Sequence, residues 1–309
     1  MKPKFNLLAL GCTGGPFEGN ISSYLVYPSG ASDQAFMIDG GSVLLGLRVA
    51  SLKGNLSDFV FEDGALMEEG EVFLRKIKGY LISHAHIDHV AGFMINSQVD
   101  SSGKFLAGTE RTIDGIRDHL FNHEVWPNYG SEGQEPVLNK YHYVRLPYAE
   151  RVVLPSLGMS VECYPLAHPR DYISTAFLLE YEGYYLLYCG DTASDALEKE
   201  KHLARLWRRI APLIRTKQLR GLLIECSVPE AQSGQVIYGH LNPRLLLAEL
   251  SHLREEVGEE LDGLKIVVTH RKESLLRCCA QQQIADELCA ANHLGVEFIF
   301  PEQGDKLCF

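Results

Sequence analysis

The stretch Ser83-His84-Ala85-His86-Ile87-Asp88-His89 places three histidines and one aspartate within six residues. It follows the apolar run Gly79–Ile82, which predicts a strand that delivers these side chains to one turn. Neutral imidazoles and carboxylates are ligands that suit zinc and similar divalent ions. A single histidine here would more often be structural or solvated, but so many polar groups packed together would be costly in a core without a metal. The stretch therefore predicts a metal site.

The length and the net charge of the chain favour some classes of protein over others. The chain has 309 residues, 46% of them hydrophobic, which is enough for a substantial core. It contains no repeat and no linker, so we predict a single domain over residues 1–309. The net charge of −11 argues against a broad nucleic-acid-binding surface. It does not argue against a small anionic substrate, because two divalent metals would dominate the local field.

The cysteines and the N-terminal residues indicate the cellular compartment in which the protein is expected. The eight cysteines are scattered without a CxxC pair, which favours free thiols in a reducing compartment and predicts a cytoplasmic protein. Lys2 and Lys4 precede Phe5–Cys12, which superficially suggests a signal segment or a lipidated cysteine. That apolar run is too short for a signal core and is typical of a first strand. The periplasm is the alternative if a signal peptide has been removed. No stretch is long and apolar enough to predict a membrane span.

Strand-like and helix-like patterns alternate along the chain. The expected strands are Phe5–Cys12, Ile21–Tyr27, Ala35–Asp39, Lys78–Ser83, Tyr141–Leu146, Met159–Leu166, Thr175–Tyr181, Tyr184–Cys189, Gly221–Cys226 and Lys265–Thr269. The expected helices are Val43–Lys53, Phe61–Ile77, His89–Gln98, Ala196–Lys217, Pro243–Val257 and Ser274–Leu294. Strands in two groups with helices between them predict an α+β fold, a four-layer αββα sandwich.

The pattern His-x-His-x-Asp-His of residues 84–89 resembles the signature of the metallo-β-lactamase superfamily. The resemblance implies a β-sandwich flanked by helices, with two metals at its edge. His84 and His86 would bind one metal, and Asp88 and His89 the other. The signature alone does not decide the reaction, because one fold hosts many activities.

Three further candidate ligands, His168, Asp191 and His270, each follow an expected strand. A polar residue at a strand end is also compatible with simple solvent exposure. The superfamily resemblance implies that His168 completes the first site, that His270 completes the second, and that Asp191 bridges both metals. Two divalent ions, with zinc expected and manganese or iron as alternatives, would share a hydroxide that attacks phosphorus or a carbonyl carbon.

A closer resemblance, to the class II 3′,5′-cyclic-nucleotide phosphodiesterases, covers nearly the whole chain. It is carried by four segments: His84–Ser97, Leu120–Asn128, Ile224–Ser227 and Tyr238–Pro243. The blocks Phe-Asn-x-x-x-Trp-Pro and Gly-His-Leu-x-Pro are the more diagnostic, because the broad superfamily lacks them. Ile87 stands where the family usually has leucine, and Gln98 where alanine or proline is usual. Neither position is a ligand.

The resemblance also implies catalytic residues. His240 matches the position of a histidine in the related tRNase Z enzymes that is catalytic and not a metal ligand, and its natural role is general acid. Glu225 ends the preceding strand and could orient its ring. The alternative is that His240 caps a helix and Glu225 is a surface group. Asp88 and His240 are both expected to be essential for turnover.

Candidate substrate contacts are less constrained by the sequence. Asn122 and His123 could touch the base or phosphate, and Trp126 could stack on a base. The alternative is a packed insertion in which Phe121 and Trp126 belong to the core. Arg170 is either a phosphate contact or part of a loop salt bridge.

The leading hypothesis is metal-dependent hydrolysis of cAMP, with cGMP as a second substrate, to the 5′-nucleotide. The first alternative is an RNA-processing endonuclease of the tRNase Z type, which the acidic charge disfavours. The second is a metal-containing binding domain without catalysis, which the complete ligand set disfavours. The expected partner is a small cyclic nucleotide, not a nucleic acid or a membrane, and a homodimer is implied by the family alone.

Overall fold

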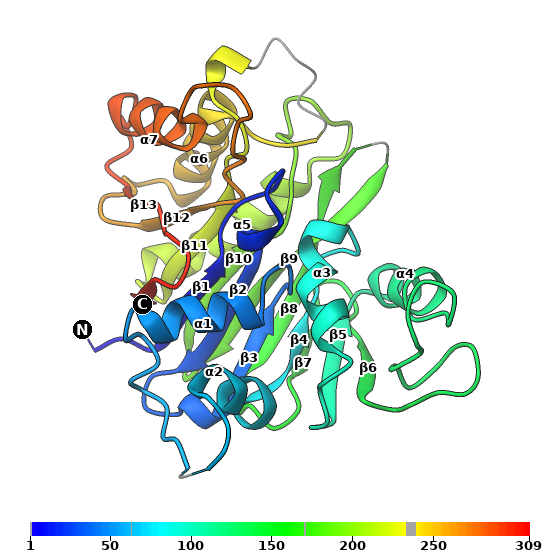
Figure 1. Ribbon diagram of the computed structural model, residues 1–309. Coiled ribbons are helices and arrows are strands. Elements are labelled where there is room, and N and C mark those ends of the chain that lie inside the picture. Colours follow the sequence, from blue (N-terminus) through cyan, green and yellow to red (C-terminus); the bar gives the residue numbers. More distant parts are fainter. Residues whose placement is uncertain (1, 63, 170, 233–238) are drawn as a thin grey trace. The chain divides into compact units, whose positions relative to one another are not determined.

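The computed structural model describes residues 2–62, 64–169, 171–232 and 239–309 (Figure 1). The chain forms two compact units. The first comprises Met1–Cys12, Phe17–Ser160 and Glu302–Phe309, and the second comprises Thr13–Pro16 and Val161–Pro301. Each unit has its own hydrophobic core. The single domain predicted over residues 1–309 stays a prediction.

The first unit is built on a seven-stranded sheet with the order β14-β1-β2-β3-β4-β5-β6. Its strands are β1 (Phe5–Gly11), β2 (Ser23–Pro28), β3 (Ala35–Ile38), β4 (Ile77–Leu81), β5 (Lys104–Gly108), β6 (Tyr141–Arg145) and β14 (Lys306–Cys308). Strands β3 to β6 run parallel. The carboxyl ends of β3 and β4 therefore meet at one edge, which brings the residues after Ile38 close to those after Leu81.

Helices of the first unit are α1 (Leu44–Leu52), α2 (Glu68–Glu71), α3 (Ile87–Asn96) and α4 (Glu110–His119), with a π-helix at Val72–Lys76 and 3₁₀ turns at Glu18–Asn20 and Ser32–Gln34. The helix predicted over Phe61–Ile77 is wrong in its first half. Leu66 and Met67 are exposed, so their apolar side chains lack a core to pack against. The strand β5 and the helix α4 were not predicted.

The second unit holds neighbouring strands in the order β13-β12-β11-β10-β9-β8. They are β8 (Ser160–His168), β9 (Tyr172–Tyr181), β10 (Tyr184–Cys189), β11 (Leu219–Glu225), β12 (Lys265–Thr269) and β13 (Glu297–Ile299), and the short β7 (Arg151–Val153) precedes β8 in the chain. The turn Glu182-Gly183 joins β9 to β10, which pair antiparallel as a hairpin. Strands β10 to β12 are parallel, so Asp191, Glu225 and His270 follow or end strands at the same edge.

Helices of the second unit are α5 (His202–Arg215), α6 (Pro243–Val257) and α7 (Ala280–Ala290), with a 3₁₀ turn at Glu230–Gln232. The predicted helix Ala196–Lys217 begins later, because the carboxylate of Asp195 accepts hydrogen bonds from the backbone N–H groups of Leu203 and Ala204. The predicted helix Ser274–Leu294 also begins later, at Ala280. In the described part of the chain, no helix has the length and hydrophobicity to cross a membrane.

Candidate metal centre

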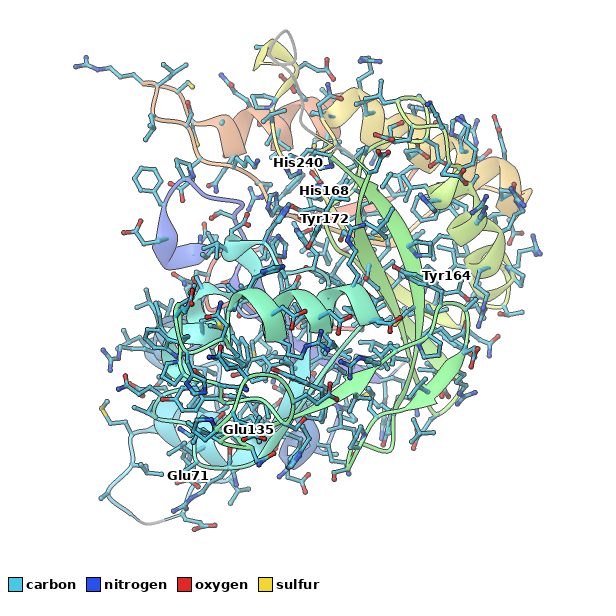
Figure 2. All side chains as sticks on the ribbon, turned by 90° about the vertical axis from the view of Figure 1, so that its right-hand side faces the viewer. Glu71, Glu135, Tyr164, His168, Tyr172 and His240 are labelled. Carbon is cyan, nitrogen blue, oxygen red and sulfur yellow. The ribbon has the colours of Figure 1, made fainter. Side chains whose placement is uncertain are left out.

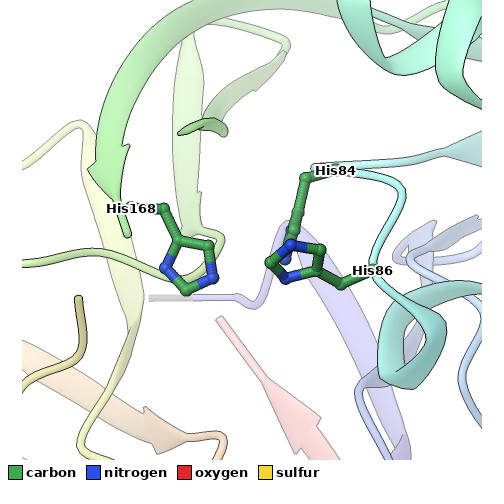
Figure 3. A group of neighbouring side chains, drawn as sticks. All are labelled: His84, His86 and His168. Atoms are coloured by element: carbon green, nitrogen blue, oxygen red, sulfur yellow. The ribbon is translucent and has the colours of Figure 1, made fainter. Parts of the chain in front are cut away.

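Four of the predicted ligands lie together at the edge of the first sheet. His84 and His86 stand in the turn between β4 and α3 (Figure 3), and Asp88 and His89 belong to the first turn of α3. The ring centroid of His84 lies 4.5 Å from that of His86 and 4.2 Å from that of His89. The Nε2 atom of His89 is 4.0 Å from a carboxylate oxygen of Asp88. The local sequence therefore gathers a nitrogen and oxygen ligand set of the kind that divalent metals prefer.

Asp39 orients two of these imidazoles and was missed by the sequence analysis. Its carboxylate accepts hydrogen bonds from the backbone N–H of Ser83 (2.7 Å), from the Ser83 hydroxyl (2.8 Å) and from Nδ1 of His89 (2.8 Å). Because the Ser83 hydroxyl donates to Asp39, it accepts from Nδ1 of His84 at 3.0 Å. Both rings therefore keep Nε2 as the atom with a lone pair. The only signal in the sequence was an aspartate at the end of an expected strand.

Asp191 is the centre of the candidate ligand set in the second unit. Its Oδ2 atom lies 3.3 Å from Nε2 of His270, 3.7 Å from Nε2 of His168 and 3.8 Å from Nδ1 of His240. The carboxylate and all three rings are buried. His168, Asp191 and His240 bring their ligand atoms close enough together to hold an ion. Figure 2 shows His168 at the end of β8, with Tyr172 and His240 nearby.

Two of these histidines are also held through Nδ1. The carbonyl oxygen of Gly239 accepts from Nδ1 of His168 at 3.0 Å. The hydroxyl of Ser227 donates to Glu225 at 2.6 Å and therefore accepts from Nδ1 of His270 at 2.9 Å. This repeats the arrangement of Asp39, Ser83 and His84, with a serine between a buried carboxylate and an imidazole. In each ring Nε2 is again the nitrogen that could bind a metal.

Glu225 is completely buried and accepts four hydrogen bonds. The donors are the backbone N–H of Thr192, Nδ1 of His240, the hydroxyl of Ser227 and the backbone N–H of Leu241. The alternative of a surface carboxylate is therefore wrong. The N-cap of α6 is Asn242, whose side chain accepts from the backbone N–H of Leu245, so His240 is not the helix cap either. The predicted hydrogen bond between Glu225 and His240 is present at 2.8 Å.

Burial and neighbouring charges shift the pKa of His168 differently from the pKa values of Glu225 and His240. Burial lowers the pKa of His168 to about 4, so its ring is neutral at physiological pH, as a metal ligand must be. Burial disfavours the charged forms of Glu225 and His240, but their attraction and hydrogen bond outweigh it. The pKa of Glu225 is consequently lowered and that of His240 is raised. This arrangement suits a proton donor whose charged form is stabilised by a fixed carboxylate.

Gly14 lies against the ring of His270 and leaves no room for a side chain. A Cβ atom at Gly14 would lie 2.1 Å from Cε1 and 2.5 Å from Nε2 of His270. We expect Gly14→Ala to displace this imidazole and to lower the metal content per chain, measured by elemental analysis of the folded protein. Gly70→Ala is the control, because its nearest neighbour would be 3.9 Å away. An unchanged metal content in Gly14→Ala would contradict a ligand role for His270.

The predicted substrate contacts make local interactions in the first unit. The side-chain oxygen of Asn122 accepts from the backbone N–H groups of Glu124 and Val125, and Nε2 of His123 lies 3.1 Å from the carbonyl oxygen of Pro136. The indole N–H of Trp126 donates to the hydroxyl of Ser97, and the ring packs against the core. Arg170 lies outside the described residues. A substrate role for these four residues stays a prediction.

Comparisons with known proteins show to which family the chain belongs. Residues 6–304 match the family model described as cAMP phosphodiesterases class-II. A 3′,5′-cyclic-nucleotide phosphodiesterase of Aliivibrio fischeri is 37% identical over 308 residues, which cover 99% of this chain and 93% of that protein. A 3′,5′-cyclic-nucleotide phosphodiesterase of Schizosaccharomyces pombe is 28% identical over 328 residues, which cover 97% of this chain and 92% of that protein.

Solved structures show the same fold. The structure of unliganded yeast PDE1 matches with a TM-score of 0.89 at 23% identity, covering 99% of this chain and 100% of the other. The metallo-β-lactamase fold protein YhfI of Bacillus subtilis matches with a TM-score of 0.62 at 15% identity, covering both chains completely. The predicted metallo-β-lactamase-like α+β sandwich is confirmed, as is the predicted enzyme class. The chain belongs to the family of class II cAMP phosphodiesterases.

Proposed function

We propose that this chain hydrolyses 3′,5′-cyclic nucleotides to 5′-nucleotides with two divalent metal ions. The first ion would be held by His84, His86, His168 and Asp191. The second would be held by Asp88, His89, His270 and Asp191. One observation carries the assignment: the Nδ1 atoms of His84, His89, His168 and His270 are all hydrogen-bonded within their own units, which leaves Nε2 as the ligand atom in each ring.

The donor set fits the metals that we propose. It contains imidazole nitrogens and carboxylate oxygens and no thiolate, which suits zinc, with manganese and iron as alternatives. When bound, such ions neutralise charge on the phosphodiester and activate water at neutral pH. The chain's own residues would do the rest. Glu225 holds the ring of His240 through Nδ1 and stabilises its charged form, so that His240 can donate a proton to the departing 3′-oxygen.

Removal of the metals tests the proposed function directly. We expect dialysis against a chelator to abolish conversion of cAMP to 5′-AMP, and added zinc or manganese to restore it, measured by chromatography of the nucleotides. The metal content of each sample is measured alongside by elemental analysis. Hydrolysis that persists in protein shown to be free of metal would contradict the proposal. Less than one metal per freshly purified chain, with no turnover, would favour a non-catalytic domain.

A substrate panel separates the remaining alternatives. We propose cAMP as the substrate and cGMP as a second one, and both belong in the panel together with a precursor tRNA. Cleavage of the precursor tRNA without hydrolysis of either cyclic nucleotide would favour the RNA-processing alternative. A homodimer, which light scattering would detect, and a cytoplasmic location also stay predictions. Cys12, Cys163, Cys189 and Cys226 are buried and form no disulfide with another described cysteine, which supports a reducing compartment.

A further inference from the structure

Lys272 lies two residues after His270 in a segment that the second unit fixes firmly. Its backbone N–H donates to the carbonyl oxygen of Ser227 at 3.0 Å, and the next N–H, of Glu273, donates to Gly15 at 3.1 Å. The preceding guanidinium, of Arg271, donates to the carbonyl oxygen of Pro301 at 2.8 Å and lies over the ring of Phe300. These contacts fix the backbone of Lys272 beside the candidate metal centre.

The ammonium group of Lys272 points at the catalytic histidine. Its Nζ atom lies 3.1 Å from Nε2 of His240, the ring nitrogen opposite the one that Glu225 holds. Within the described part of the chain, no carboxylate lies within 4.0 Å of this Nζ atom. Other lysines differ: Lys104 and Lys306 lie 2.7 Å and 2.6 Å from the carboxylates of Asp100 and Asp58. Lys272 is thus a part-buried cation with N–H donors to spare.

We infer that Lys272 is a further catalytic residue, whose ammonium group binds a non-bridging oxygen of the substrate's phosphodiester beside His240. This inference rests on the proposed function. Glu225 fixes the ring so that Nε2 of His240 faces the same point as the ammonium group of Lys272. A phosphoryl oxygen at that point would be the acceptor that both groups require. Lysine is suited to this task, since it binds phosphate as a mobile point charge.

The contact would act on the charge of the phosphoryl group and involves no covalent step by Lys272. During phosphodiester hydrolysis the negative charge is spread over the phosphoryl oxygens, and a fixed cation stabilises it. The product carries a second negative charge on its phosphate, so Lys272 should also hold 5′-AMP. It should contribute nothing to the binding of adenosine, which has the same base and sugar but no phosphate.

Three substitutions of Lys272 distinguish an effect of its charge on the phosphate from an effect of its hydrogen bond on the position of His240. Lys272→Met removes the charge and the donors, Lys272→Gln keeps a donor for His240 without charge, and Lys272→Arg keeps the charge. We expect Met and Gln variants to bind 5′-AMP about 10- to 150-fold more weakly by calorimetry, the loss typical of one charge-assisted hydrogen bond, while binding of adenosine is unchanged. The Arg variant should recover part of that loss. Lys265→Met, at the start of β12, is the matched control.

The outcomes distinguish the inference from the function on which it rests. If the wild-type chain hydrolyses cAMP but Lys272→Met and Lys265→Met bind 5′-AMP equally well, Lys272 does not contact the phosphate and the inference is overturned. Full recovery in Lys272→Gln would overturn it too, because a hydrogen bond to His240 would then be the whole role. If the wild-type chain hydrolyses no cyclic nucleotide, the proposed function fails first and the assignment of Lys272 falls with it.

Discussion

Glu225→Gln is expected to lower kcat for cAMP by about 10²- to 10⁴-fold, the range for loss of a general acid or of the carboxylate that orients it. The carboxylate accepts two hydrogen bonds on each oxygen. An amide has one oxygen, so its NH₂ group must face either His240 and Thr192 or Ser227 and Leu241. The ring of His240 loses the stabilising charge in either case, and it also loses its acceptor when the NH₂ group faces it. The measurement is steady-state kinetics on protein with confirmed metal content.

A second buried glutamate supplies the control for stability. Glu249 is 1% exposed and accepts hydrogen bonds from Ser194, Asp195 and Trp207. Glu249→Gln should destabilise the protein to a similar degree, about 1–3 kcal/mol for each donor left without an acceptor. It should leave kcat near the wild-type value, because it does not touch His240. Equal kcat losses in both variants would mean that Glu225 acts only through the fold.

Asp191→Asn is expected to lower the metal content and to reduce turnover on the order of 10³-fold, since bound metals supply several kcal/mol of transition-state stabilisation. The substitution keeps the size of the side chain and removes the charge at the point where Oδ2 faces His270, His168 and His240. Elemental analysis and a hydrolysis assay on the same sample measure both effects.

Asp195→Asn is the matched control for this variant. Asp195 is buried four residues further along and accepts from the N–H groups at the start of α5. Its replacement should lower the melting temperature slightly, by the cost of a weakened helix cap, and should leave the metal content unchanged. A full complement of metal in Asp191→Asn would argue against the bridging role.

Several site residues could be predicted from the sequence because they are close together in the chain or directly follow a strand. Residues 84–89 sit in one turn, so their spacing alone brings the ligands together. His270 follows a strand whose bounds, Lys265–Thr269, were predicted correctly. The residues that orient the ligands could not be predicted in this way. Asp39 meets Ser83 only because β3 and β4 pair in parallel, across 44 residues of sequence.

Helix starts and long-range contacts account for the other misses. Periodicity extended the helix that begins at His202 back to Ala196, because the sequence does not show that Asp195 supplies the capping carboxylate. Lys272 was not predicted, because the contact that suggests its role is with His240, which lies 32 residues earlier in the chain. Such pairings depend on the order of the strands in the sheet, and a single sequence does not state that order.

The hydrogen bonds to Nδ1 also bear on how the chain acquires its metals. Ser83, Asp39, Gly239 and Ser227 fix the tautomer and direction of four imidazoles through bonds that need no ion. Each half of the ligand set is thus arranged by folding, and an incoming ion has little ordering entropy to overcome there. Metals should then exchange without refolding of the protein, and the ion found in the cell would reflect supply as much as selectivity.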